Sequence, residues 1–540
     1  MGPAVRWTSR SHSRRVIIVK LIQARVPVID IFAGPGGLGE GFSAYPIGGT
    51  ESIFKIRLSL EKEENAHRTL QLRAFYRQFR KGEAPEAYYR LLRQEITLSE
   101  LYAAYPVQAA AAATEALQVT LGADNWEFTR DKIASALNGA KEWLLIGGPP
   151  CQAYSLAGRA RNRGVVGYDA QEDNRHFLYH EYLRILATFK PSVFVMENVK
   201  GILSSKPSGS FLFEKIKQDL RHPGAAMQAG TSMANTGDCV NYRLFSLAPS
   251  GQDSFVLRAE QHGIPQARHR VIIIGVREDL GNICPEPLQV QDSVPLGQVI
   301  NDLPRIRSGI TRAVDSVENW LNIIHLAADR RWFLTIKRRA PHLADQLESA
   351  VARIRAPRAD RGAEFIPHQT FPAYMREWYS DPNIGGICNH YSRPHMQKDL
   401  YRYFYAACFA LAENISPKLR DFPMDLLPNH ANVADAIEGN NLFQDRFRVQ
   451  LPDRPSTTVT SHISKDGHAF IHYDPTQCRS MTVREAARAQ TFPDNYLFTG
   501  SRTAQYTQVG NAVPPLLANQ IADRVYRVLD QAGIIQKLSS

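Results

Sequence analysis

Cysteine is scarce in this chain of 540 residues, and long apolar runs are missing. The cysteines form no Cys-x-x-Cys pair, which argues against a disulfide framework or a zinc site and favours a reducing compartment. They are Cys151, Cys239, Cys284, Cys388, Cys408 and Cys478. No run approaches the roughly 18 apolar residues of a membrane span, and the N-terminus has no apolar signal-peptide core. We therefore expect a cytoplasmic protein without a membrane partner.

Acidic residues are fewer than basic ones: the chain has 53 Asp and Glu and 64 Lys and Arg, which gives a net charge of +11. Such a balance suits a polyanionic partner, although basic proteins with other partners exist. The hydrophobic fraction of 44% supports a substantial core, and the length exceeds one ordinary domain. Residues 1–25 read as a basic N-terminal arm.

An abrupt loop follows the apolar residues 143–146 and carries a cysteine. Residues 147–155 read Gly-Gly-Pro-Pro-Cys-Gln-Ala-Tyr-Ser. Glycine and proline end a strand here, and the carboxyl end of a strand is where open α/β sheets bind ligands. Cys151 is therefore a candidate nucleophile. The alternative is a buried structural cysteine.

A glycine-rich turn follows the strand predicted at residues 28–31. Its spacing, Gly34-x-Gly36-x-x-Gly39, formally fits a dinucleotide-binding turn. Residues 54–60 read as the next strand, and Glu61 at its end could bind the ribose hydroxyls of either NAD or S-adenosylmethionine. These residues leave the choice of cofactor open.

Charged residues also border two further apolar segments. Glu197 closes the strand predicted from Val193, and a carboxylate there is costly to bury without a partner. Arg268 and Arg270 share one side of an extended segment. Parallel strands would bring Glu197 and Cys151 to one pocket. The alternatives are a surface or helix-capping role for Glu197 and a solvated edge for the arginines.

Together these segments resemble the ordered motifs of the bacterial type of DNA (cytosine-5) methyltransferase. The matching motifs span about residues 28–522 and are Asp30–Gly39, Glu61, Pro149–Gln152, Glu197–Val199, Gln266–Arg270, Thr482–Pro493 and Gln508–Pro514. The resemblance implies an α/β fold, in which a Rossmann-like S-adenosylmethionine-dependent methyltransferase domain holds a smaller inserted target recognition domain.

The resemblance also implies a reaction, namely methyl transfer to carbon 5 of a flipped cytosine in a specific duplex DNA sequence. Cys151 would add to carbon 6 of the ring as the nucleophile. Glu197 would protonate ring nitrogen 3. Arg270 would contact the carbonyl oxygen at position 2, with Arg268 supporting it. This chemistry needs no metal.

A cofactor site for S-adenosylmethionine follows from the same resemblance. Its expected members are Phe32, Gly34, Gly36, Gly37, Glu61, Pro149, Leu178, Asn511 and Val513. The family usually places an aspartate that contacts adenine after the third strand. That residue does not align here, and Leu121, Gly122 or Asp131 are the candidates.

Two segments interrupt the catalytic scaffold. Residues 65–135 predict a helical insertion that serves as a lid or packing element. Residues 281–455 occupy the place of the target recognition domain. The predicted division is thus an arm at 1–25, a catalytic domain at 26–280, the recognition domain at 281–455, and a C-terminal part at 456–540 that completes the catalytic domain.

Three features of the recognition segment suggest DNA contact. Residues 329–361 hold nine basic and four acidic residues around Trp332 and Phe333. They suit phosphate contacts, although a solvated helical face is an equal alternative. Residues 389–395 carry polar groups able to reach base edges. Residues 453–467 read as a hairpin that leads back into the scaffold.

The expected partners are double-stranded DNA and a cognate restriction endonuclease acting on the same site, with the chain a monomer in a restriction–modification setting. Three alternatives stay open. The nearest is an RNA cytosine-5 methyltransferase, which the long 281–455 segment argues against. A non-catalytic DNA-binding homologue would leave Cys151, Glu197 and Arg270 without a role. An NAD-dependent oxidoreductase explains only the glycine turn.

Overall fold

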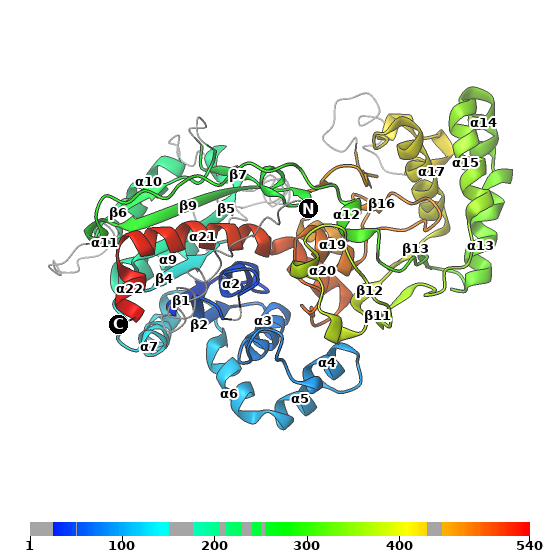
Figure 1. Cartoon of the computed structure of the whole chain (residues 1–540). Helices are drawn as coiled ribbons and strands as arrows, with labels where there is room; N and C mark the ends of the chain where they lie inside the picture. Colours follow the sequence, from blue (N-terminus) through cyan, green and yellow to red (C-terminus); the bar gives the residue numbers. More distant parts are fainter. Residues whose placement is uncertain are drawn as a thin grey trace, which may run out of the picture.

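A computed structural model describes residues 25–49, 51–150, 177–204, 212–228, 240–249, 254–428 and 445–539. Figure 1 shows a sheet with helices on both faces, a group of small helices beneath it, and a second lobe beside it. None of the helices in the described ranges combines the length and apolarity needed to cross a membrane.

The main sheet has the strand order β3-β2-β1-β4-β5-β9-β6, and β7 pairs with β9. Its strands are β1 Val26–Ile31, β2 Phe54–Glu61, β3 Ala116–Gln118, β4 Leu144–Gly147, β5 Val193–Val199, β6 Tyr242–Phe245, β7 Val256–Arg258 and β9 His269–Arg277. The strands from β3 to β5 are parallel, and β9 runs antiparallel to β5. The predicted α/β fold class is confirmed.

Apolar side chains on both faces of the sheet explain the layers. Every residue of β1 is buried. Its alternate side chains enter two different cores, with Val28 on one face and Ile29 on the other. Helices α2 (Gly37–Ser43) and α21 (Pro515–Gln531) cover the first face. Helices α7 (Trp126–Leu137), α9 (Phe177–Phe189) and α10 (Leu212–Arg221) cover the second.

The segment predicted as a helical insertion supplies both extra helices and parts of the scaffold. The small helices are α3 Glu64–Tyr76, α4 Glu86–Leu92, α5 Leu98–Ala104 and α6 Pro106–Glu115. They share a separate apolar core. The edge strand β3 and helix α7, which packs against the sheet, lie within the same segment. The third strand was missed because it is only three residues long.

A second lobe forms around its own apolar core, which contains Trp320, Leu347 and Phe404. The elements that line this core are β10 Gly309–Ile310, α13 Val317–His325, α14 Arg331–Arg339, α15 Pro341–Arg353 and α17 Gln397–Glu413. The same part of the chain also holds α12 Gly297–Ile300, β11 Gly362–Ile366, α16 Arg376–Tyr379, β12 Ile387–Tyr391 and β13 Pro394–His395. Of these, α12, α16 and Ile387 of β12 pack in the core on the first face of the main sheet. Strands β11 and β12 pair antiparallel, whereas β10 and β13 pair parallel. The predicted domain boundaries remain predictions.

The hairpin predicted at residues 453–467 is wrong. Strand β15 (Ser456–Thr457) runs parallel to β8 (Gln266–Ala267), and β14 (Val449–Gln450) runs parallel to β16 (Ile471–His472). Backbone partners distant in sequence therefore take the hydrogen bonds that a local hairpin would have used. Helices α19 (Val483–Ala489) and α20 (Arg502–Asn511) follow.

Candidate active site

Glu197 and Arg270 meet at the carboxyl edge of the sheet. Strands β5 and β9 are neighbours, and Val199 pairs with Arg270 in their register. Arg270 Nε lies 2.8 Å from Glu197 Oε1, and each side chain is 13% exposed. The ion pair is thus only partly screened by solvent, and it can be reached by a ligand at this edge.

The loop that leads to Cys151 starts against this ion pair. A Cβ atom at Gly148 would lie 2.8 Å from Glu197 Oε2, so glycine allows the close approach. Asn198 donates from Nδ2 to the carbonyl of buried Pro149 at 3.5 Å. Cys151 itself lies outside the described residues. The structure nevertheless brings the start of its loop to Glu197.

Arg268 lies behind the ion pair. Its Nη1 donates to the carbonyl oxygens of Val459 (2.8 Å) and Gly510 (3.3 Å). The side chain is fully buried, and burial, with the charge of Arg270, lowers the pKa of Arg268 well below its ordinary value. Arg268 therefore joins the start of β9 to the C-terminal segments.

The glycine turn and Glu61 form a second group at the same edge. Glu61 accepts hydrogen bonds from the backbone N–H groups of Gly34 and Glu63, both at 2.7 Å. Among the described residues, none has an atom within 4 Å of a Cβ atom placed at Gly34, so the described part of the chain leaves open space beside the turn there. Phe32 has a φ of +54°, an unusual conformation that clusters at functional sites.

The C-terminal segment closes this group from one side. A Cβ atom at Gly37 would lie 2.2 Å from the Val513 carbonyl oxygen, so only glycine fits. Gly36 has a φ of +97°. Val513 is buried, whereas Asn511 is exposed at the end of α20. The structure thus brings the predicted glycines and Val513 together.

Leu178 and the candidates for adenine recognition lie on segments other than the glycine turn and β2. Leu178 is half-buried in the first turn of α9, directly after the residues that the structure does not describe. Among the candidates for adenine recognition, Leu121 is buried and Gly122 adjoins it, shortly after β3. Asp131 is on α7, paired with Arg130 and largely exposed.

Five of the seven residues of the polar segment 389–395 are buried, so the prediction that their polar groups reach base edges is wrong. His390 donates from Nε2 to the Pro304 carbonyl (2.8 Å) and accepts at Nδ1 from the Thr482 hydroxyl (2.9 Å). Burial lowers the pKa of His390 to about 4. Asn389, Ser392, Arg393 and His395 are buried as well. The segment packs the second lobe against α19.

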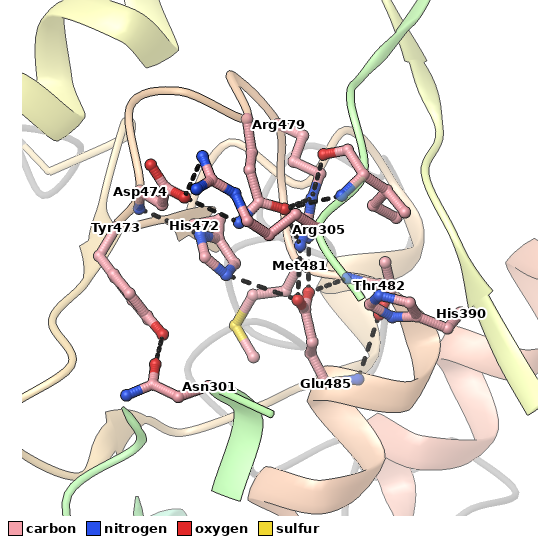
Figure 2. Close-up of polar contacts among 12 residues, drawn as sticks. Asn301, Arg305, His390, His472, Tyr473, Asp474, Arg479, Met481, Thr482 and Glu485 are labelled. Carbon is pink, nitrogen blue, oxygen red and sulfur yellow. Dashed lines mark hydrogen bonds and ion pairs between the residues drawn. The ribbon is translucent and has the colours of Figure 1, made fainter. Parts of the chain in front are cut away.

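Figure 2 shows the polar network that continues from His390. Arg479 binds both oxygens of Glu485, with Nη1 and Nη2 at 2.7 and 2.6 Å. His472 Nε2 lies 3.5 Å from Glu485 Oε1. Burial opposes the ionisation of Glu485, but the charges of Arg479 and His472, together with the hydrogen bonds from Arg479, outweigh it and hold the pKa of Glu485 well below its ordinary range. These paired groups hold the lobes together.

The basic stretch 329–361 is divided between surface and core. Trp332 and Phe333 are buried in the core of the second lobe, so they do not interleave with the basic side chains. The basic side chains of α14 and α15 are exposed, including Arg338 and Arg339, and Lys337 pairs with Glu348 at 2.7 Å. Phosphate contact by these helices remains a prediction.

An open cavity of about 480 Å³ lies against the β8–β15 pair. It is lined by Ala267, Arg448, Thr457, Thr458, Thr460, His462, Ala469 and Phe470. Sequence analysis did not single out Arg448 and His462. The only sequence feature that could have pointed to this cavity is the group of threonines Thr457, Thr458 and Thr460, which line it. Among the described residues, no three His, Cys, Asp or Glu side chains gather as a metal site would require.

Comparison with known proteins identifies the family. Residues 131–527 match the family model of C-5 cytosine-specific DNA methylases. The type II methyltransferase M.Bpa9945I of Bacillus paralicheniformis is 33% identical over 524 residues, which cover 93% of this chain and 99% of the relative. M.DdeI of Desulfomicrobium norvegicum, also a type II methyltransferase, is 28% identical, covering 72% and 74%. The chain belongs to the C-5 cytosine-specific DNA methylase family.

Proposed function

We propose that this chain transfers a methyl group from S-adenosylmethionine to carbon 5 of a cytosine that is flipped out of a specific duplex DNA sequence. Family membership gives the class of reaction, DNA cytosine methylation. The observation that carries the residue assignment is the Glu197–Arg270 ion pair beside the start of the Cys151 loop.

The residues at the glycine turn fit the methyl donor that this family uses. When bound, S-adenosylmethionine supplies an electrophilic methyl group. The carboxylate of Glu61 is suited to its ribose hydroxyls, and the open space at Gly34 leaves room beside the backbone. In the proposed site, Phe32, Pro149 and Leu178 supply apolar contacts. The donor is also approached from two segments: the glycine turn supplies Gly34, Gly36 and Gly37, and the C-terminal segment supplies Asn511 and Val513.

Cys151 makes carbon 5 of the ring reactive. Its thiolate adds to carbon 6 while ring nitrogen 3 takes a proton from Glu197, so the ring becomes an enamine. Carbon 5 would then bond to the methyl group as the bond between that methyl group and the donor sulfur breaks. Water would take the carbon 5 proton as the bond between the Cys151 sulfur and carbon 6 breaks, and nitrogen 3 would return its proton to Glu197, which restores the aromatic ring, the thiolate and the acid.

Glu197 and Arg270 suit one edge of the cytosine ring. Nitrogen 3 and the carbonyl oxygen at position 2 are adjacent there, and the two side chains lie 2.8 Å apart. Glu197 can hold the proton at nitrogen 3 while Arg270 stabilises negative charge on the oxygen. Arg268 fixes the strand that carries Arg270, through its contacts with Val459 and Gly510.

The remaining assignments concern DNA and partners. A paired cytosine does not expose its ring to a thiol, so the base must leave the stack, at a cost of a few kcal/mol. Residues 281–455 would read the sequence, and the exposed basic side chains of α14 and α15 would contact phosphates. The relatives are named type II methyltransferases. These names support our proposal that the chain acts in a restriction–modification setting beside a cognate endonuclease. We further propose, as a separate expectation, that it acts as a monomer.

Bisulfite sequencing tests the proposed function. The chain is expressed in a host without cytosine methylation, beside Cys151→Ala. Protected cytosines in one recurring context, only with the thiol present, are expected. Unprotected DNA from folded protein that binds S-adenosylmethionine would contradict the DNA assignment, and labelling of RNA by the same protein would favour the RNA alternative.

A further inference from the structure

A buried ion pair fixes the helix that follows the glycine turn. Glu40 lies in the first turn of α2, and its side chain is 6% exposed. Arg73 of α3 binds both of its oxygens, with Nε at 2.8 Å and Nη2 at 2.5 Å. Burial opposes the ionisation of Glu40, but the charge and hydrogen bonds of Arg73 lower its pKa below the ordinary value. Such a bidentate pair has one geometry, so α2 is held against α3.

A second arginine extends this cluster to the end of α6. Arg77 Nη1 lies 3.9 Å from Glu40 Oε2, and its Nη2 donates to Glu115 at 2.6 Å. Both Arg77 and Glu115 are largely buried. The two arginines balance the two glutamates, which limits the cost of burying the charges. Through Arg77, the small helices are tied to α2.

The backbone of the turn is packed from the same side. Tyr496 donates its hydroxyl to the Pro35 carbonyl, and the Arg73 guanidinium lies 4.9 Å from the centroid of the Tyr496 ring. A Cβ atom at Gly36 would lie 2.8 Å from Leu70 Cδ1 and 2.9 Å from the Tyr496 hydroxyl. The turn therefore rests on α3 and Tyr496, whereas its open space is at Gly34.

We propose that Arg73 is a positioning residue for the methyl donor. Through Glu40 and Tyr496 it holds the Gly34–Gly37 turn in the geometry that binds S-adenosylmethionine, without contacting the donor itself. The inference rests on the proposed function, because it takes this turn as the donor site. It gives the small helices a role in cofactor binding.

Calorimetric titration of S-adenosylmethionine into the full chain tests this role. Arg73→Gln is expected to weaken binding about tenfold and to raise KM for the donor by a similar factor. The kcat at saturating donor and the Kd for DNA should stay within about twofold, because only the donor site is loosened. A general folding defect would instead change all four quantities.

Arg68→Gln is the matched control. Arg68 lies on the same helix and pairs with Glu64 at 2.5 Å, but both side chains are more than half exposed. Such a surface pair contributes little, so the affinity for the donor should match that of the unaltered chain. Arg73→Lys keeps the charge and loses the bidentate fork, so a loss of about threefold is expected.

The inference is overturned if Arg73→Gln folds, as judged by circular dichroism, and binds the donor as tightly as the unaltered chain. If Arg73→Gln does not fold, unaltered affinity in Arg73→Lys overturns it. Donor binding by the unaltered chain and by Glu61→Gln distinguishes an error in the role of Arg73 from an error in the proposed function. An unaltered chain that binds no donor contradicts the proposed function. If Glu61→Gln loses donor binding while the Arg73 variants bind as tightly as the unaltered chain, the role of Arg73 is contradicted and the proposed function is not.

Discussion

The sheet edge around Glu197 and the segment around His390 are both rich in polar residues, yet the fold uses them in opposite ways. Glu197 and Arg270 remain partly exposed beside the start of the Cys151 loop. His390 is fully buried, with both ring nitrogens hydrogen-bonded within the protein. A polar residue at the carboxyl end of a parallel strand in the open α/β sheet indicates a ligand site, whereas polarity alone, as in the antiparallel strand β12, does not.

Glu197→Gln should show the largest effect. Loss of the proton donor is expected to lower kcat by about 10²- to 10⁴-fold, as measured by methyl transfer to DNA, while Tm changes by only a few degrees. Asp279→Asn is the control, because Asp279 pairs with Arg277 near the other end of β9 and is mostly exposed. Full activity in Glu197→Gln would place the proton donor elsewhere.

Glu485→Gln should lower the stability of the fold and leave the activity unchanged, the reverse of Glu197→Gln. It leaves the buried Arg479 guanidinium without its carboxylate, so the free energy of unfolding in urea should fall by about 3–5 kcal/mol. Methyl transfer per folded molecule should be unchanged. Glu348→Gln breaks the exposed pair with Lys337 and should leave the free energy of unfolding almost unchanged. Equal costs in the two variants would show that the network of Figure 2 does not hold the lobes together.

Acid should destabilise the fold through the buried histidines His390 and His472. Burial lowers the pKa of His390 and of His472 to about 4, below the value near 6.5 in an unfolded chain. Between these values the unfolded state binds more protons, so stability is lost as pH falls from about 6.5 to 4. Urea unfolding of His390→Asn should show a smaller loss over this window. An identical pH dependence in this variant would contradict the burial of a neutral His390.

The smallest effect is expected at the exposed basic helices. Arg338→Gln should weaken DNA binding alike for all sequences and reduce the slope of log K against log salt by about one. Fluorescence anisotropy over a range of salt concentrations measures this slope. An unchanged slope would indicate that α14 presents a solvated face, which was the alternative interpretation.

Strands β1, β2, β4, β5 and β9 could be predicted from the sequence because each holds an apolar or alternating run beside glycine or charged residues. The strands near Val28, Phe54 and Val193 were expected within a few residues of their bounds. The three-residue β3 and the parallel pairing of β15 with β8 were missed, since distant backbone partners form them. Such pairings leave no local pattern.

The candidate site shows the same limit. The resemblance implied that Glu197 and Arg270 contact the same cytosine ring, and their side chains lie 2.8 Å apart. The expected approach of Cys151 to Glu197 remains a prediction. The burial of His390 could not be foreseen, because its partners, Pro304 and Thr482, lie about ninety residues away on either side. Trp332 likewise enters a core that is complete only in three dimensions.

The most direct test of the proposed chemistry is covalent trapping by Cys151. A duplex with 5-fluorocytosine at the methylated position of the context found by bisulfite sequencing is mixed with the chain and S-adenosylmethionine. Fluorine cannot leave as a proton does, so we predict a complex of one chain and one duplex that survives denaturation. The complex should be absent with Cys151→Ala. Methylation of normal cytosine without any trapped complex, or a complex that persists in Cys151→Ala, would contradict the assignment of Cys151 as the nucleophile.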